Sequence, residues 1–269
     1  MSQNYIKLTD LAYGYGTKIL RQAVNLTITT GDFLALIGPN GIGKTSLLNI
    51  ILELKRPLQG TLVKNHALIE HYAPEHFPPT KLTARAYLKS IASIRAVSTK
   101  RPNNYAALVD SLAFQSLLDI PADKLSKGSL QKLNLIQALG GHPDVLLLDE
   151  PLEGLDEKAQ LFLLDWLTAY NQAGNTIIMS VHGQRLANRA KTIYDVAHNT
   201  LMTTTNTNQA TYLVSFKVTP DAALAKIFKL FTYEKAATKV VLTCTAKDLI
   251  TVLLLLEQND FELLTITKQ

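Results

Sequence analysis

The sequence predicts an α/β protein whose mixed sheet surrounds a phosphate-binding loop, followed by a small C-terminal α+β domain. Three observations predict this fold class. Residues 38–45 match the pattern G-x-x-x-x-G-K-[ST] between an apolar run and a helical run. Residues 144–150 form an apolar run that ends in two carboxylates, as expected for a parallel strand covered on both faces. After a Thr/Asn-rich stretch at 203–210, a separate strand–helix alternation begins.

The composition allows a large hydrophobic core. Of the 269 residues, 47% are hydrophobic and 18% are charged, which is typical of a folded rather than a disordered chain. The net charge of +5 is scattered and specifies neither nucleic acid nor a membrane as a partner. Cys244 is the single cysteine, so an internal disulfide is excluded. The longest apolar run, 249–256, is much shorter than the ~20 residues of a membrane helix.

The elements before the middle of the chain read mainly as strands. Short strands at 6–9 and 24–28 flank an aromatic turn at 13–17. A strand at 33–37 enters the phosphate-binding loop, and a helix follows from 46. The next predicted elements are strands at 61–63 and 67–69, and a proline-rich loop at 73–80.

A mostly helical insert follows, and the α/β pattern then resumes. We expect helices at 83–97, 105–118 and 130–139, and we assign about 76–140 to a helical subdomain. Ser126 and Ser129 are N-cap candidates for the last of these helices. The later elements are a strand at 144–150, a helix at 155–170, a strand at 176–181 and edge strands at 192–194 and 201–202.

The compositional change near residue 204 predicts two domains, 1–204 and 205–269. In the second domain we expect strands at 212–218, 239–245 and 261–267, with helices at 220–231 and 246–258. This alternation is typical of a small α+β domain of the ferredoxin-like kind.

The loop at 38–45 has the chemistry of a nucleoside triphosphate site. Its glycines allow backbone N–H groups to form a nest for anionic oxygens, and the following helix adds its positive end. We expect Lys44 to reach the β- and γ-phosphates and the Thr45 hydroxyl to bind Mg²⁺. The predicted nucleotide-binding residues here are Gly38, Pro39, Asn40, Gly41, Ile42, Gly43, Lys44, Thr45 and Ser46.

The two carboxylates that end the apolar strand complete this site. Asp149 is placed to hold Mg²⁺, and Glu150 could accept a proton from an attacking water. The sequence therefore predicts in-line attack of water on the γ-phosphate of the bound nucleoside triphosphate, with Lys44 and Glu150 among the catalytic residues.

Five motifs together resemble the ATP-binding subunit of an ABC transporter, over about residues 3–200. The matching segments are Walker A at 38–45, the signature at 125–132, Walker B at 145–150, the D-loop at 153–156 and the switch histidine His182. The resemblance implies an ATPase that forms a head-to-tail dimer, homomeric or heteromeric, with ATP and Mg²⁺ between two cassettes. It also implies that Ser126 and Gly128 bind the partner's γ-phosphate and that His182 senses that phosphate. Tyr15 matches the aromatic residue that stacks on adenine, with Tyr13 as the competing candidate.

Several positions depart from the family pattern. Glu75 occupies the position of the usual Q-loop glutamine, where it could bind Mg²⁺ or water or face the membrane partner. Lys127 and Ser129 replace a glycine and a glutamine of the signature, and Glu153 replaces a small residue of the D-loop. These departures concern turnover and coupling rather than the ATPase assignment.

The leading functional hypothesis is a transporter ATPase that works with separate integral membrane permease subunits. The stretch 79–84 and the helices after it resemble ATPases of drug- and peptide-exporting systems, which implies export. We therefore expect a cytoplasmic subunit, peripheral on the inner face of the cell membrane, without a nucleic-acid partner. The alternatives are a soluble ABC-type ATPase acting on ribosomes or DNA, and a low-turnover regulatory or immunity module that binds ATP.

Overall fold

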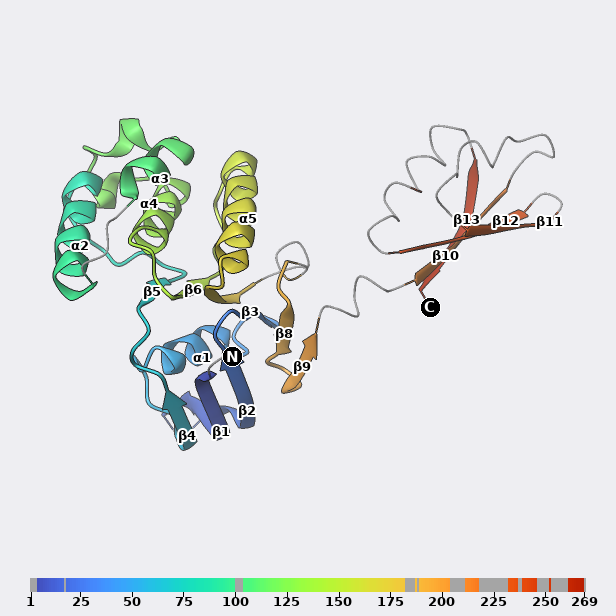
Figure 1. The fold of residues 1–269 in the computed structure, drawn as a ribbon, viewed down its shortest axis with the longest axis horizontal. Coiled ribbons are helices and arrows are strands. Elements are labelled where there is room, and N and C mark those ends of the chain that lie inside the picture. Colours follow the sequence, from blue (N-terminus) through green and yellow to red (C-terminus); the bar gives the residue numbers. More distant parts are fainter. Residues whose placement is uncertain are drawn as a thin grey trace. The chain divides into compact units, whose positions relative to one another are not determined.

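The computed structural model describes two compact units, residues 1–202 and 203–269, and each is considered by itself (Figure 1). The described residues are 4–16, 18–99, 104–181, 187, 189–203, 211–217, 232–236, 239–245, 252 and 261–268. The sequence places the division two residues later, between 204 and 205.

A three-stranded antiparallel sheet begins the first unit. It contains β1 (Asn4–Tyr15), β2 (Lys18–Thr29) and β4 (Gln59–Lys64), in the order β2-β1-β4. The short strands expected at 6–9 and 24–28 are parts of these longer strands. The aromatic turn expected at 13–17 is wrong for Tyr13 and Tyr15, because their backbones pair with Arg21 and Lys18 and extend the hairpin.

The phosphate-binding loop lies beside a six-stranded sheet with the order β5-β6-β7-β3-β8-β9. Its first four pairings, from β5 to β8, are all parallel. The strands are β3 (Phe33–Ile37), β5 (Glu70–Ala73), β6 (Val145–Asp149), β7 (Thr176–Ser180), β8 (Thr192–Asp195) and β9 (Thr200–Thr203). Because parallel strands end at one edge, β3 and β6 bring the loop and the two carboxylates together.

Both faces of this sheet are covered, which explains the uninterrupted apolar runs in its strands. One hydrophobic cluster joins the sheet to α1 (Lys44–Ile51) and the three-stranded sheet, and another joins it to the remaining helices. The strand residues in the first cluster include Leu34, Leu36, Val145, Leu147 and Ile178. Those in the second include Phe33, Ala35, Leu146, Leu148, Ile177 and Met179.

The helical insert differs in detail from its prediction. It contains α2 (Ala84–Thr99), α3 (Tyr105–Ser111) and α4 (Lys127–Leu139), with 3₁₀ turns at Gln115–Leu117 and Ala122–Lys124 between the last two. The single helix expected at 105–118 is wrong because Ala113, with a φ of 52°, interrupts it. The signature helix α4 starts three residues before the expected 130, because the Ser126 hydroxyl caps it by accepting from the Ser129 N–H at 3.2 Å.

The strand expected at 67–69 is also wrong, and β5 begins at Glu70 instead. Ala67 donates its N–H to Asn65 Oδ1 at 3.0 Å, which fixes a turn at this point. Ile69 donates to Asp144 Oδ2 at 2.9 Å, so parallel pairing starts one residue later, between Glu70 and Val145. Side-chain hydrogen bonds therefore override the apolar pattern of 67–69.

The second unit contains one antiparallel sheet with the order β11-β12-β10-β13. Its strands are β10 (Thr211–Lys217), β11 (Thr232–Ala236), β12 (Lys239–Thr245) and β13 (Glu262–Lys268). The sequence prediction lacks β11, whose polar residues show no clear alternation. The β10–β11 and β12–β13 connections each pass one intervening strand, as the split βαβ arrangement requires. The helices expected at 220–231 and 246–258 lie outside the described residues, apart from Val252.

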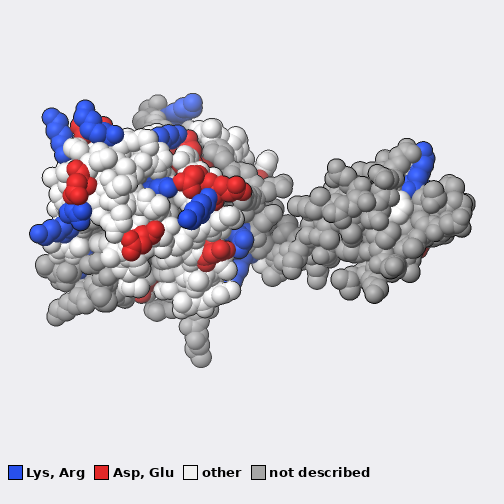
Figure 2. Space-filling model, turned by 90° about the horizontal axis from the view of Figure 1, so that it is seen from above, with Lys and Arg blue, Asp and Glu red and all other residues white. Residues whose placement is uncertain are grey.

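The described side chains on the face shown in Figure 2 form no large patch of a single charge. Acidic and basic side chains of the first unit are interspersed there. Within the described part of the chain, no helix has both the length and the apolar composition needed to cross a membrane.

The N-cap of α5 (Glu157–Gln172) allows a direct test of this local structure. Asp156 accepts from the Ala159 N–H at 2.9 Å and pairs with Lys132 at 2.6 Å. The hydrogen bond from Lys132 lowers the pKa of Asp156, and the Ala159 N–H lowers it further. We expect Asp156→Ala to lower the free energy of unfolding by about 1–2 kcal/mol near neutral pH, measured by urea denaturation.

Because the folded-state pKa of Asp156 is lowered, this contribution is present above the pKa of the unfolded chain. It is lost as the pH falls through the folded-state value. Asp165→Ala, at an exposed position of the same helix, is the matched control and should have little effect. Equal losses in the two variants would contradict the capping role.

Candidate functional site

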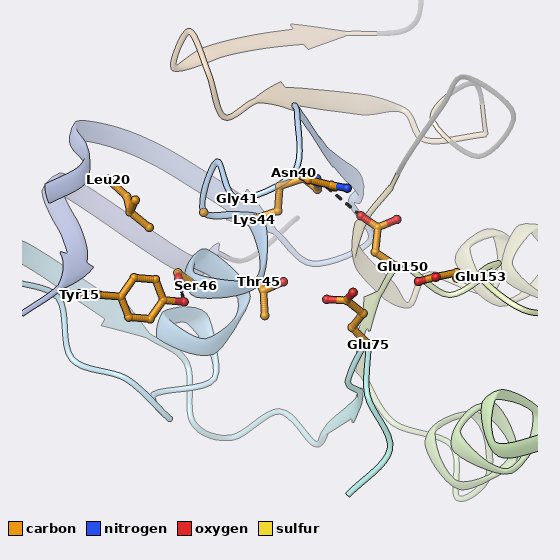
Figure 3. A pocket seen from close by; sticks show the side chains of 11 residues that line it. Tyr15, Leu20, Asn40, Gly41, Lys44, Thr45, Ser46, Glu75, Glu150 and Glu153 are labelled. Atoms are coloured by element: carbon orange, nitrogen blue, oxygen red, sulfur yellow. Dashed lines mark hydrogen bonds and ion pairs between the residues drawn. The ribbon is translucent and has the colours of Figure 1, made fainter. Parts of the chain in front are cut away.

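A cavity of about 560 Å³ lies over the phosphate-binding loop. Its volume is in the range typical of small-molecule sites. The side chains at its two ends differ in character: Tyr15 and Leu20 lie at one end, and Glu75, Glu150 and Glu153 lie at the other (Figure 3). The other residues that line it are Asn40, Gly41, Gly43, Lys44, Thr45 and Ser46. The cavity therefore has one end suited to a planar group and one suited to a cation or water.

The backbone of the loop depends on Gly43 at the start of α1. Its φ of 110° lies in the left-handed region, which other residues rarely adopt. A Cβ at this position would lie 2.9 Å from the Tyr13 ring, so the absence of a side chain also allows close packing. The loop therefore rests on a buried aromatic residue, with the N-terminus of α1 facing the cavity.

Lys44 is held inside the loop. Its side chain is 6% exposed and donates to the carbonyls of Gly38 at 2.9 Å and Pro39 at 3.4 Å. Its Nζ also lies 3.6 Å from Glu150 Oε1, as the dashed line in Figure 3 shows. The cation is thus fixed where a phosphate chain would meet it, opposite the carboxylate that ends β6.

Asp149 is almost fully buried, with 1% of its surface exposed. Its Oδ1 accepts a hydrogen bond from the Ser180 hydroxyl, and its Oδ2 has no hydrogen-bond partner among the described residues. Burial raises the pKa of the neighbouring Tyr72, and the negative charge of Asp149 raises it further. A buried carboxylate oxygen without a donor is suited to a cation or its bound water, so this residue fits the predicted Mg²⁺.

Glu150 has a left-handed backbone, with a φ of 49°. Its N–H donates to the Ser180 Oγ at 3.0 Å, and Gln131 Nε2 approaches its carbonyl at 3.5 Å. These contacts hold the chain in a reversal directly after the strand. The Glu150 side chain consequently points at Lys44 (Figure 3). The Asp149 side chain remains buried.

The segment that carries Glu75 is fastened to α4. Asn134 donates to the Pro74 carbonyl at 2.6 Å, and Gln137 donates to the Tyr72 carbonyl at 2.7 Å. Gln131 donates to the Pro151 carbonyl at 3.1 Å in the same way. The sequence analysis missed these three positioning residues. Their spacing of three residues along one helix, on a buried face, was the available signal.

The signature segment lies outside the lining of this cavity. Ser126 is exposed, and its hydroxyl is used within its own turn, 2.9 Å from the Ser129 hydroxyl. Lys127 forms an ion pair with Glu153, so two departures from the family pattern contact each other. A Cβ at Gly128 would lie 2.5 Å from the Gly154 carbonyl oxygen, so glycine is required there by contact with the D-loop.

The two candidate tyrosines have different surroundings. Tyr13 is fully buried beneath Gly43, and burial raises the pKa of its phenol. Tyr15 is 62% exposed, lines the cavity and shares a hydrogen bond of 2.9 Å with Ser46. Tyr15 is therefore the tyrosine accessible to a nucleotide base.

Two further predicted loop residues, Pro39 and Ile42, contact each other through their backbones: the Ile42 N–H donates to the Pro39 carbonyl at 3.3 Å. His182 lies outside the described residues.

Among the described residues, no group of three or more His, Cys, Asp or Glu side chains forms a metal site by itself. Mg²⁺ commonly uses one or two carboxylates together with substrate phosphates and water, which matches the donors around Asp149.

Comparison with known proteins places the chain among ABC transporters. A family model described as "ABC transporter" matches residues 21–153. The macrolide export ATP-binding/permease protein MacB of Campylobacter jejuni is 28% identical over 232 residues, covering 80% of this chain and 36% of that protein. The zinc import ATP-binding protein ZnuC of Marinobacter nauticus is 32% identical over 168 residues, covering 61% and 63%. ZnuC of Yersinia pestis is 32% identical over 185 residues, covering 67% and 71%.

Solved structures show the same fold. The ATP-binding subunit of an ABC transporter matches with a TM-score of 0.67 and 24% identity, covering 76% of this chain and 92% of that one. A dimeric ATP-binding cassette bound to ADP and Pi matches with a TM-score of 0.61 and 23% identity, covering 71% and 93%. The chain belongs to the ABC transporter family and carries that family's ATP-binding, ATPase domain.

Proposed function

We propose that this chain hydrolyses ATP as a subunit of an ABC transporter, driving substrate movement through separate membrane subunits. The observation that carries the proposal is the placement of Lys44 and Glu150. Their side chains face each other at 3.6 Å in a cavity lined by the phosphate-binding loop. A buried cation for phosphate and a carboxylate for water are two of the groups that hydrolysis requires.

The triphosphate is held by the loop and by Lys44. The backbone N–H groups at the start of α1 and the helix dipole favour anionic oxygens. The Lys44 ammonium already donates to two loop carbonyls, so it reaches the phosphates with little loss of side-chain freedom. The base lies toward Tyr15 and Leu20, at the other end of the cavity.

Mg²⁺, when bound, neutralises charge on the phosphates. The residues that would hold it are Thr45 through its hydroxyl, Asp149 through its Oδ2, which lacks a partner in the described part of the chain, and Glu75 at the cavity rim. Asp149 is the strongest of these candidates because Ser180 fixes its other oxygen and leaves Oδ2 available.

Glu150 is the proposed general base. The phosphates compete with Glu150 for Lys44, and their binding leaves the carboxylate available to a water molecule. The carboxylate accepts one proton as that water attacks the γ-phosphorus, and ADP leaves in line. Lys44 stabilises the charge that develops on the phosphate oxygens. We also retain His182 as a proposed contact of the γ-phosphate.

A second cassette is the proposed partner of this site. Ser126 and Gly128 do not line the cavity of their own chain, and Ser126 is exposed, so we infer that they contact the nucleotide of another subunit. The solved dimeric cassette with ADP and Pi supports this arrangement.

Export is the proposed direction of transport, at the inner face of the cell membrane. Relatives named for macrolide export and Nod factor export support it. Relatives named for zinc import make import the competing direction. The chain spans 36% of MacB and 63% of the Marinobacter ZnuC, so their substrates do not transfer to it.

Replacing Glu150 with Gln tests the catalytic assignment. The variant keeps the shape of the side chain but cannot accept the proton, so we expect hydrolysis to fall by about 100-fold or more while ATP binding is retained. Single-turnover phosphate release measures the loss, and calorimetry measures binding. Glu153→Gln, a carboxylate of the same cavity that pairs with Lys127, is the matched control and should lose far less activity. Wild-type turnover by the Glu150 variant would exclude the proposed role.

Affinity capture of the full chain from its native membranes tests the biological assignment. We expect recovery of an integral membrane protein with several spans, in a complex that tolerates detergent. Recovery of ribosomes without a membrane protein would instead establish the soluble class of ABC ATPase.

A further inference from the structure

A lysine outside the cavity lining contacts the ring of the exposed Tyr15. Lys55 Nζ lies 3.6 Å from the centroid of the Tyr15 ring. This Nζ atom is buried and has no hydrogen-bond partner among the described residues. The turn that ends α1 sets its position, because the Lys55 N–H donates to the Asn49 carbonyl at 3.2 Å. A buried ammonium without hydrogen bonds is costly, so its placement over a ring face requires an explanation.

The Tyr15 side chain has two contacts, one at its hydroxyl and one at its ring, and is otherwise largely exposed. Its hydroxyl shares a hydrogen bond of 2.9 Å with Ser46, which is 2% exposed and belongs to α1. Lys55 occupies one face of the ring. Tyr15 as a residue is nevertheless 62% exposed and lines the cavity together with Leu20 (Figure 3). Because Lys55 does not line the cavity, we infer that the ring face opposite Lys55 is turned toward it. An exposed aromatic side chain held in this way is a preformed stacking surface.

We propose that Lys55 is a positioning residue for the nucleotide base, acting through Tyr15. This inference rests on the proposed function, because it concerns the base end of the same ATP site. Two effects follow from the geometry. Lys55 and Ser46 fix the ring before binding, which removes part of the ordering cost of stacking. The cation also draws π-electron density toward its own side, so the open face repels the electron-rich face of a purine less strongly.

The contribution of Lys55 to affinity should be confined to binding of the nucleotide base. Lys55 does not line the cavity, whereas Lys44 and the loop backbone contact the phosphate end. Removing the charge of Lys55 should therefore weaken ATP without weakening a ligand that consists only of phosphates. A structural role of Lys55 in folding the loop would weaken both ligands alike.

The experiment compares Lys55→Met with Lys55→Arg in the full chain. Methionine keeps an unbranched stem of similar length but loses the cation, and arginine keeps a cation over the ring. Lys191→Met, at an exposed position just before β8, controls for the change in net charge. Calorimetry with Mg²⁺ measures the dissociation constants of ATP and of inorganic tripolyphosphate.

We expect Lys55→Met to weaken ATP about three- to tenfold and to leave tripolyphosphate unchanged. Lys55→Arg should stay close to the wild-type chain for both ligands, as should Lys191→Met. In a Tyr15→Ala background, Lys55→Met should have no further effect, because Lys55 then has no ring to position. Unchanged ATP affinity in Lys55→Met, equal losses for the two ligands, or a full additional loss in the Tyr15→Ala background would each overturn the inference.

The proposed function is tested separately by the wild-type chain. Tight binding and hydrolysis of ATP by the wild type, with no effect of Lys55→Met, would remove this inference alone. A wild-type chain that binds neither ATP nor tripolyphosphate would remove both.

Discussion

The Ser180 hydroxyl organises the chemical end of the site. It donates to Asp149 Oδ1 and accepts the Glu150 N–H at 3.0 Å, so one atom joins the ends of β6 and β7. The left-handed backbone of Glu150 costs about 1–2 kcal/mol, which this hydrogen bond helps to offset. The reversal separates two adjacent carboxylates, because one stays buried in the sheet and the other enters the cavity. Different roles for neighbouring acidic residues therefore follow from one backbone conformation.

Helix α4 holds the loops that carry Glu75 and Glu150 in place. Its buried amides bind loop carbonyls beside Glu75 and Glu150, and its N-terminus carries the signature residue Ser126. At its other end, Arg95 of α2 donates to the carbonyls of Gln137 and Gly140. The helix is therefore tied both to the cavity rim and to α2, through side-chain hydrogen bonds at each end.

Much of this arrangement could be predicted from local sequence patterns. The phosphate-binding loop, the buried strands and the two carboxylates are each encoded within about ten consecutive residues, so motif and periodicity suffice. The predictions fail where a residue distant in the sequence, or an unusual local backbone conformation, sets the end of an element. Asp144 sets the start of β5, and Ala113 ends α3 through a backbone conformation that no periodicity reveals. The choice between Tyr13 and Tyr15 depends on burial beneath Gly43, which is a tertiary property.

The contact between the signature and the D-loop affects which substitutions this chain can accept at positions 127 and 153. Lys127 and Glu153 each replace a small family residue, and they neutralise each other where Gly128 packs on Gly154. Either replacement alone would leave a charge without its partner at this junction, so we expect the effects of substitutions at the two positions to depend on each other. A graft of a family-type signature into this chain must therefore carry position 153 with it, or the transplanted loop will meet a carboxylate suited to a different neighbour.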